Sequence, residues 1–157
     1  MKKVTIYTDG SSRGNPGPGG YGTIIEYIDE SGKKYEKELS AGYIKTTNNR
    51  MEVMAAIAGL EYLSEPCEVT IVSDSKYLVD TFQKKWIQSW MKNNWKNWKG
   101  QDVKNVDLWK RMMDSMKSHK VSFVWVKGHN DHPQNERCDE LAVKAAEHPK
   151  FIDEAKL

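Results

Sequence analysis

Four acidic residues stand where a folded chain could use them for chemistry. Asp9 follows a β-rich run just before a glycine, and Asp74 follows another β-rich run. Glu52 lies near the start of a segment with helical periodicity, and Asp139 lies on a later helical segment. In α/β sheets, functional side chains gather outside the carboxyl ends of the strands, where the loops diverge. The four acids are therefore the first candidates for a site, and they come from four different elements.

Each acid also has an ordinary structural interpretation. Asp9 could stabilise a turn, and Asp74 could cap the helix that follows it. Glu52 could complement the dipole at a helix N-terminus, and Asp139 could pair with a basic residue such as Lys144 on the surface. Taken one at a time, the acids leave both interpretations open.

The hydrophobic pattern changes period along the chain and predicts the elements that position these acids. Alternating and β-branched runs predict five strands, at residues 4–8, 21–28, 33–43, 67–73 and 121–126. The period of 3.6 residues and the capping residues predict helices that begin near residues 47, 75, 105 and 135. Residues 9–20 hold five glycines and two prolines, which predicts a long loop. Three strands in succession followed by alternating helices and strands indicate an α/β domain with a mixed sheet.

Length and composition limit the class of protein. The chain has 157 residues, 38% of them hydrophobic and 29% charged, so we expect one domain over residues 1–157. No apolar run approaches the roughly 18 to 20 residues of a transmembrane helix, which argues against a membrane protein. Two cysteines make no disulfide framework, and a cytoplasmic location follows as the expectation. The weakly patterned tail at residues 148–157 is expected to fray.

Positive charge is concentrated in residues 84–104, here called the protrusion. This segment holds six lysines against one aspartate, a net charge of +5, whereas the whole chain carries +2. It also holds four of the six tryptophans. A basic segment with interleaved aromatic residues indicates a polyanionic partner. Trp86 and Trp90 are four residues apart, so at least one of them is also expected to face the core.

Five motifs of the chain, in order and at the right spacing, resemble the type 1 ribonuclease H family. The resemblance runs from about residue 4 to 147 and is greatest to bacterial members that carry a basic protrusion. The motifs are Tyr7-Thr8-Asp9-Gly10-Ser11, Asn15-Pro16-Gly17-Pro18-Gly19-Gly20-Tyr21-Gly22, Thr46-Thr47-Asn48-Asn49-Arg50-Met51-Glu52, Ser73-Asp74-Ser75 with Tyr77, and Trp125-Val126-Lys127-Gly128-His129 followed by Asn135-Glu136-Arg137-Cys138-Asp139.

The resemblance implies a ribonuclease H-like fold and a metal-dependent endonuclease. Its reaction would be hydrolysis of the RNA strand of an RNA–DNA hybrid, which leaves 5′-phosphate and 3′-hydroxyl ends. It implies that Asp9, Glu52, Asp74 and Asp139 bind two Mg²⁺ ions, with Mn²⁺ as a substitute, and that His129 is a mobile catalytic histidine. The residue types suit this role, because Mg²⁺ prefers oxygen ligands and two ions can activate water and stabilise the leaving oxygen.

The resemblance also assigns residues to the substrate. Asn15, Asn48 and Asn49 would bind the hybrid, and Thr47 would contact a phosphate of the DNA strand. Lys76 departs from the family, since several members carry an amide there that touches the RNA. The remaining candidates lie in the protrusion and would line the channel for the DNA strand or neutralise its phosphates: Trp86, Lys92, Lys96 and Lys99.

Three other interpretations fit the sequence less well. A zinc site at His129, His132 and Cys138 lacks a fourth ligand and the spacing of a zinc finger. A non-catalytic module that binds hybrids or duplexes would gain nothing from four acids facing phosphates. A nuclease of the same superfamily acting on DNA is disfavoured by the asparagine-rich motif at residues 46–52. The preferred interpretation is a monomer whose partner is an RNA–DNA hybrid.

Overall fold

One five-stranded mixed sheet organises the molecule. A computed structural model describes residues 1–128 and 132–155. The strands are β1 (Lys2–Ser12), β2 (Gly17–Ile28), β3 (Lys34–Thr46), β4 (Cys67–Ser73) and β5 (Lys120–Trp125). Their order across the sheet is β3-β2-β1-β4-β5. β1 pairs with β2, and β2 with β3, in antiparallel fashion, whereas β1–β4 and β4–β5 are parallel. The predicted mixed sheet, an antiparallel meander with parallel strands beside it, is confirmed.

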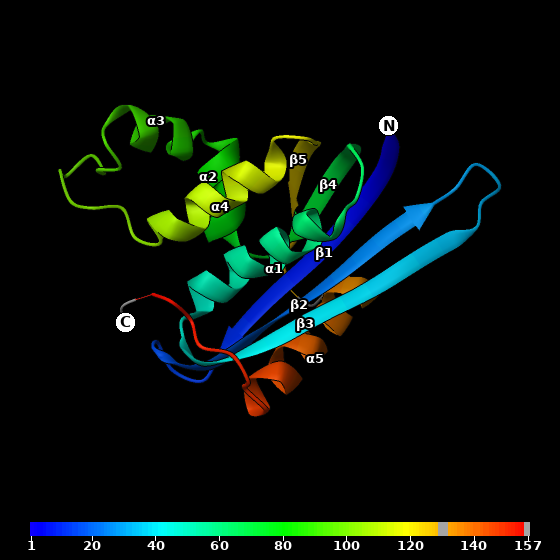
Figure 1. Ribbon diagram of the computed structural model, residues 1–157, viewed down its shortest axis with the longest axis horizontal. Coiled ribbons are helices and arrows are strands. Elements are labelled where there is room, and N and C mark those ends of the chain that lie inside the picture. The colour runs from blue at the N-terminus through cyan, green and yellow to red at the C-terminus, as the bar shows by residue number, and fades with distance from the viewer. Residues whose placement is uncertain (129–131, 156–157) are drawn as a thin grey trace.

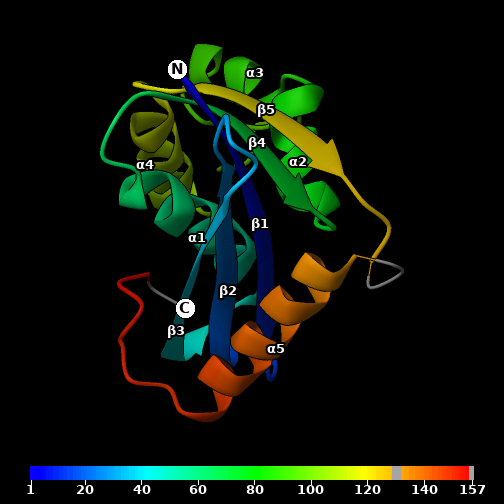
Figure 2. The ribbon, with the colours of Figure 1, turned by 90° about the vertical axis from the view of Figure 1, so that its right-hand side faces the viewer.

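Helices cover both faces of the sheet. They are α1 (Asn48–Tyr62), α2 (Lys76–Gln83), α3 (Trp86–Lys92), α4 (Val106–Met116) and α5 (Pro133–Glu147). Figures 1 and 2 show α1 and α4 on one face and α5 on the other, where it crosses β1 and β2. In the part of the chain that the structure describes, no helix is both long and apolar enough to cross a membrane.

Two helices that flank the acids begin at side-chain caps. The Thr47 hydroxyl accepts a hydrogen bond from the Arg50 backbone N–H, which starts α1. The Ser75 hydroxyl accepts one from the Leu78 N–H at 3.2 Å, which starts α2. Because Ser75 is the cap of α2, the alternative role of Asp74 as that cap is wrong.

The glycine-rich segment at residues 9–20 is not the long loop that its composition predicted. β1 and β2 stay paired through it, from Asp9 opposite Gly22 to Ser12 opposite Gly19, and only residues 13–16 lie outside the two strands. A strand ladder uses backbone groups alone, and two of these glycines, Gly10 and Gly20, serve the close approach of helices α1 and α5. Asp9 consequently lies inside β1, not at its end.

The main core lies between the sheet and the helices α1, α2 and α4. Trp109 on α4 is fully buried, and its ring contacts those of Tyr77, Phe82 and Trp90 with centroids 5.2, 5.9 and 6.0 Å apart. Trp90 therefore ties the protrusion to the core, whereas Trp86 is 40% exposed. The expectation that at least one of these two tryptophans faces the core is confirmed for Trp90.

The C-terminal segment packs against the body of the protein, which differs from the expected fraying. The Ile44 N–H donates to the Phe151 carbonyl at 2.9 Å, and the Phe151 N–H donates to the Gly42 carbonyl at 3.0 Å. The Phe151 ring lies 5.8 Å from that of Tyr43. The segment thus continues beside β3 and then turns toward α1 (Figure 1).

Candidate active site

Three of the four candidate acids meet at one place. Carboxylate oxygens of Asp9, Glu52 and Asp74 lie within 4.8 Å of one another. The register of the sheet brings two of them together, because Thr8 pairs with Ser73 in the parallel β1–β4 ladder and the next residue of each chain segment is an aspartate. The cluster lies beyond the carboxyl end of β4, next to β1.

Glu52 reaches Asp9 because α1 lies directly on β1 at Gly10. A Cβ atom on Gly10 would lie 2.4 Å from the Glu52 nitrogen, so only glycine allows this approach. The Gly10 N–H donates to Asp9 Oδ1 at 2.9 Å and also to Glu52 Oε1. One backbone donor therefore serves two carboxylates and fixes their relative positions.

Asp139 arrives from the opposite face of the sheet. Gly22 is the cross-strand partner of Asp9, and a Cβ on Gly22 would lie 2.2 Å from the Cys138 carbonyl oxygen of α5. This close packing sets Asp139, the next residue, near enough for its charge to act on Asp9. Asp139 is partly buried and stands beside the compact group of three acids.

The crowding changes the acidity of two of these groups. Burial, followed by the charges of Asp74 and Asp139, raises the pKa of Asp9 from its ordinary 3.8 to about 7. The hydrogen bonds that Asp9 shares with Glu52 and Gly10 act in the opposite direction. Burial, followed by the charge of Asp9, also raises the pKa of Glu52 well above its ordinary value. Acids held together at such a cost are suited to a cation, which would neutralise their repulsion.

The chemistry of the donor atoms in the cluster of three acids suits a divalent metal ion. Hard cations such as Mg²⁺ and Mn²⁺ take oxygen ligands, and every donor in the group is a carboxylate oxygen. The zinc alternative fits less well. Cys138 is fully buried and its thiol donates to the Tyr7 carbonyl at 3.3 Å, so the sulfur faces the interior.

His129 lies outside the described residues, and its expected role stays a prediction. The preceding residue, Gly128, is described, and a Cβ placed on it would lie 3.2 Å from Asp74 Oδ2. The chain thus passes the carboxylate group at Gly128.

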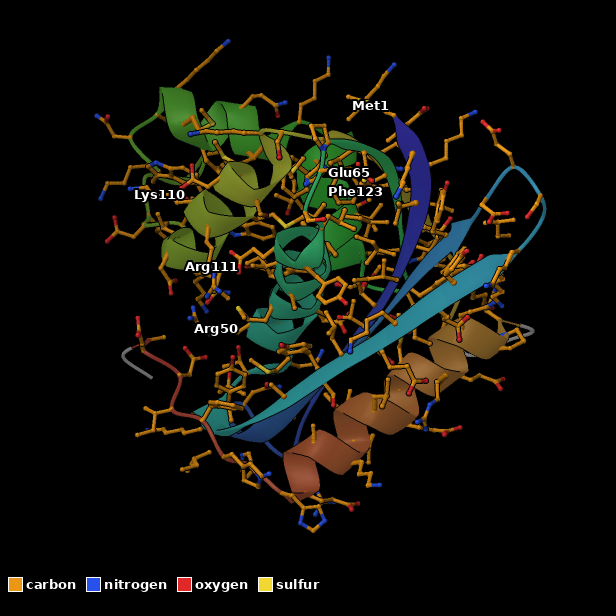
Figure 3. All side chains as sticks on the ribbon, turned by 45° about the vertical axis from the view of Figure 1, so that its right-hand side comes forward. Met1, Arg50, Glu65, Lys110, Arg111 and Phe123 are labelled. Carbon is orange, nitrogen blue, oxygen red and sulfur yellow. The ribbon has the colours of Figure 1, made fainter. Side chains whose placement is uncertain are left out.

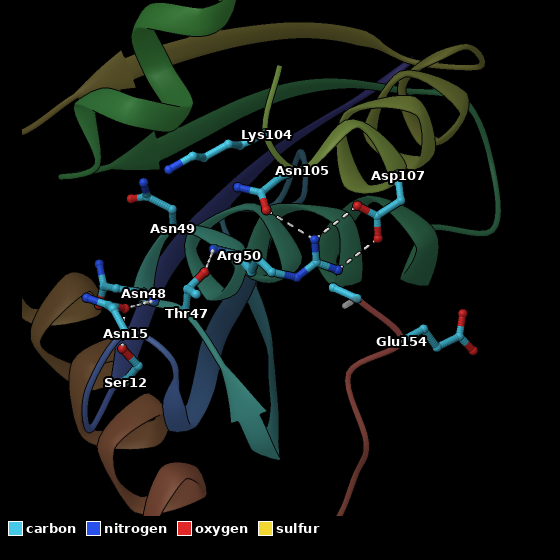
Figure 4. A pocket seen from close by; sticks show the side chains of 11 residues that line it. Ser12, Asn15, Thr47, Asn48, Asn49, Arg50, Lys104, Asn105, Asp107 and Glu154 are labelled. Carbon is cyan, nitrogen blue, oxygen red and sulfur yellow. Dashed lines mark hydrogen bonds and ion pairs between the residues drawn. The ribbon is translucent and has the colours of Figure 1, made fainter. Parts of the chain in front are cut away.

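A hollow of about 1080 Å³ lies over the first turn of α1 (Figure 4). Its lining includes the four residues that the resemblance assigned to the substrate, which are Asn15, Thr47, Asn48 and Asn49. Lys104 lies on the other side of the hollow (Figure 4), and Glu154 and Ala155 of the C-terminal segment also line it. The predicted substrate residues are therefore neighbours, about one helical turn from Glu52.

Hydrogen bonds within the protein orient two of these residues. Asn15 Oδ1 accepts from the Ser12 hydroxyl at 2.9 Å and from the Asn48 N–H at 2.8 Å, so the Nδ2 group is the donor that Asn15 can offer to a ligand. Thr47 Oγ1 is an acceptor in the helix cap, and its hydroxyl hydrogen can be given to an anionic oxygen.

The other predicted substrate residues lie on exposed surfaces. Lys76 places its ammonium 4.8 Å from the ring centroid of Trp125, and Trp125 Nε1 donates to the Asp74 carbonyl at 3.1 Å. Lys76 is thereby linked to the loop of Asp74. Trp86 is partly exposed, and so are the three protrusion lysines, which are Lys92, Lys96 and Lys99. Lys96 pairs with Asp102, and Lys99 lies 5.1 Å from the ring of Trp98.

Sequence reasoning missed a buried polar network beside the hollow. Arg50 on α1 bonds to Asn105, Asp107 and Asp153, which lie far from it in the chain. Figure 3 shows Arg50 on the part of α1 near α4 and the C-terminal segment. The one available signal was the arginine itself, directly after the four small polar residues 46–49.

Comparison with known proteins agrees with this architecture. The family model described as RNase H matches residues 1–147. A protein named Ribonuclease H from Lachnoclostridium phytofermentans is 59% identical over 153 residues, which cover 97% of each chain. Another, from Salmonella paratyphi C, is 54% identical over 98% of this chain and 95% of that protein.

Solved structures share the fold. LC9-RNase H1, described as a type 1 RNase H with the type 2 active-site motif, superposes with a TM-score of 0.85 at 31% identity, over 96% of this chain and 74% of that one. LC11-RNase H1 in complex with an RNA/DNA hybrid superposes with a TM-score of 0.64 at 27% identity, over 92% and 96% of the two chains.

The sheet, the helices on both faces and the cluster of acids define a metal-dependent nuclease of the α/β class. The chain belongs to the ribonuclease H family.

Proposed function

We propose that this protein hydrolyses the RNA strand of RNA–DNA hybrids as an endonuclease and leaves 5′-phosphate and 3′-hydroxyl ends. The observation that carries the proposal is the meeting of Asp9, Glu52 and Asp74 within 4.8 Å in a chain of this family. A structural relative was solved with an RNA/DNA hybrid, which supports the same substrate here.

Asp9, Glu52, Asp74 and Asp139 would hold two Mg²⁺ ions, with Mn²⁺ as a substitute. When bound, such a pair activates a water molecule and stabilises the leaving 3′-oxygen. The protein's part is to hold the four carboxylates in place through the close contacts at Gly10 and Gly22. His129 is proposed to assist proton transfer or product release.

The substrate residues would recognise the shape and hydroxyls of the hybrid. Such a duplex has a wide, shallow minor groove that displays 2′-hydroxyls on the RNA strand. Asn15, Asn48 and Asn49 supply small polar groups for this groove, and the Thr47 hydroxyl would donate to a phosphate of the DNA strand. Lys76, Trp86 and the three protrusion lysines would hold the flanking backbone, mostly by charge.

The test is cleavage of one labelled sequence as RNA–DNA, RNA–RNA and DNA–DNA duplexes. Each duplex is incubated with Mg²⁺ or EDTA, and with wild type, Asp9→Asn or Asp114→Asn protein. Asp114 is an exposed acid paired with Lys117, so its variant is the matched control. We expect cutting of the RNA in the hybrid alone, dependent on the metal and on Asp9. Binding of hybrid without any cutting would favour the non-catalytic module, and cutting of the DNA duplex would overturn the substrate.

We also propose that residues 1–157 form one monomeric domain that works in the cytoplasm, with residues 84–104 as its protrusion. Both cysteines, Cys67 and Cys138, are buried free thiols, which accords with a reducing compartment. Light scattering of the purified protein tests the monomer.

A further inference from the structure

The Arg50 guanidinium is buried and uses all of its donors. Its side chain is 3% exposed. Nη1 donates to Asn105 at 3.2 Å and to Asp107 at 3.0 Å, Nη2 donates to Asp107 and to Asp153 at 2.8 Å each, and Nε donates to Asp153 at 2.8 Å. An arginine has five N–H donors, and all five are satisfied here. Arg50 is therefore held in one conformation from two sides.

The Asp153 carboxylate accepts hydrogen bonds from side chains on both sides of Thr47 in the sequence. It accepts from Arg50, three residues after Thr47, through both of its oxygens. It also accepts from the Thr46 hydroxyl, immediately before Thr47, at 2.7 Å. The Asp153 side chain is only 7% exposed. One carboxylate thus joins the last residue of β3 to the first turn of α1.

The backbone of the C-terminal segment delivers Asp153 to this position. Phe151 is joined to β3 by hydrogen bonds to Gly42 and Ile44, and Asp153 follows two residues later. The Ala155 N–H then donates to Asp153 Oδ1 at 3.1 Å, which closes a small turn at the rim of the hollow. Asp153 is consequently fixed by its own backbone as well as by its partners.

We propose that Asp153 is a positioning residue for hybrid binding, which acts through Thr46 and Arg50 to hold Thr47, Asn48 and Asn49 in the hollow. The inference rests on the proposed function. Asp153 lies in the C-terminal segment, beyond residues 1–147, the part that the family model matches. In this role the carboxylate acts through its partners Thr46 and Arg50 and not by contact with the hybrid.

The acids of the proposed metal site are held in place by contacts that do not involve Asp153. Glu52 is held by the contact of α1 with Gly10 and by the Gly10 N–H. Removal of the Asp153 carboxylate would therefore loosen the first turn of α1 and leave the group of acids in place. This predicts a change in KM for the hybrid with little change in kcat.

An effect of charge alone would change KM in the opposite direction to a loss of positioning, so the experiment can tell the two apart. Asp153→Asn removes a negative charge beside a site for a polyanion, and electrostatics would strengthen binding. The amide also keeps the size of the side chain but replaces an acceptor with a donor that faces the donors of Arg50. Loss of positioning would weaken binding. The two effects move KM in opposite directions.

The experiment compares steady-state cleavage of a hybrid by wild type, Asp153→Asn and Asp107→Asn in saturating Mg²⁺, well below each melting temperature. Asp107 is the matched control, since it also pairs with Arg50 but is 56% exposed and makes no contact with Thr46. We expect KM to rise about fivefold or more for Asp153→Asn and less than about twofold for Asp107→Asn, with kcat within about twofold in both.

A KM that is unchanged or lower for Asp153→Asn overturns the inference, and so does an equal rise for Asp107→Asn. If Asp153→Asn does not fold, Thr46→Val removes one of the same hydrogen bonds and is expected to raise KM about twofold, with no rise counting against the role. Failure of the proposed function is a separate result, because wild type would then not cut the hybrid at all.

Discussion

Replacement of Asp9 by asparagine is expected to stabilise the metal-free protein while it abolishes activity. Asp9 is buried beside two other acids, and its pKa rises to about 7 in the folded protein from 3.8. Asparagine keeps the size and an oxygen that can accept from the Gly10 N–H, but it carries no charge. The variant would lose a metal ligand and also a source of repulsion.

The magnitude follows from the difference in pKa. The interval from 3.8 to about 7 corresponds to about 4 kcal/mol, at 1.36 kcal/mol per pH unit. Glu52 and Asp74 share the same repulsion, and an unfolded chain keeps some interactions, so the net gain is expected to be about 1 to 3 kcal/mol. For a protein of this length, that corresponds to a melting temperature about 3 to 10 °C higher.

The gain depends on pH in a defined direction. A carboxyl with a raised pKa binds more protons in the folded state than in the unfolded state between pH 3.8 and about 7, so wild type loses stability as the pH rises through that interval. Well below pH 3.8, Asp9 is protonated in both states and contributes no difference. The advantage of Asp9→Asn should therefore be full at about pH 8 and mostly lost at about pH 4.

The assay is thermal unfolding followed by circular dichroism in EDTA, at about pH 8 and about pH 4, for wild type, Asp9→Asn and the exposed control Asp114→Asn. The control should differ from wild type by less than about 0.5 kcal/mol at the higher pH. The reasoning is refuted if Asp9→Asn is no more stable than wild type at the higher pH, or if its advantage is equally large at the lower pH.

Three further outcomes are expected. Mg²⁺ at about ten times its dissociation constant should stabilise wild type by about 1.4 kcal/mol in thermal melts but leave Asp9→Asn unmoved, and an unmoved wild type would contradict the metal site. Alanine at the three protrusion lysines should make the slope of log K for hybrid against log salt shallower by about 0.9 for each phosphate that is no longer neutralised, while turnover at saturation is kept, and an unchanged slope would reject their role. Gly22→Ala should cost about 1 to 3 kcal/mol in urea unfolding, since its Cβ meets the Cys138 carbonyl, and an unchanged midpoint would show that α5 can yield.

Much of the fold could be predicted from local patterns. The β-rich runs predicted the five strands, and the helix starts near residues 47 and 75 were predicted correctly, because these signals lie within a few residues. The cap of the second helix is Ser75 and not Asp74. The prediction for residues 9–20 was wrong for the same reason. Local composition cannot tell a glycine of a loop from a glycine on which a distant helix rests.

The candidate site also has a part that could be predicted from the sequence and a part that could not. The positions of Asp9 and Asp74 after matched points of two parallel strands could be predicted once the sheet was assumed. The Arg50–Asp153 contact joins residues 103 positions apart, and the C-terminal segment has no periodicity that marks it as buried. A contact between one residue of a motif and one residue of an unpatterned tail has no local signature.

The supply of the acids from four separate elements has a consequence for when the protein becomes able to cut. Asp9 and Asp139 are 130 positions apart in the chain, and they meet only after helices have docked on both faces of the sheet. In a chain still emerging from the ribosome, or in one whose last helix has come loose, at most three of the acids are assembled in one place. Under the proposed mechanism, in which all four acids hold the metal ions, cleavage requires the completely folded molecule.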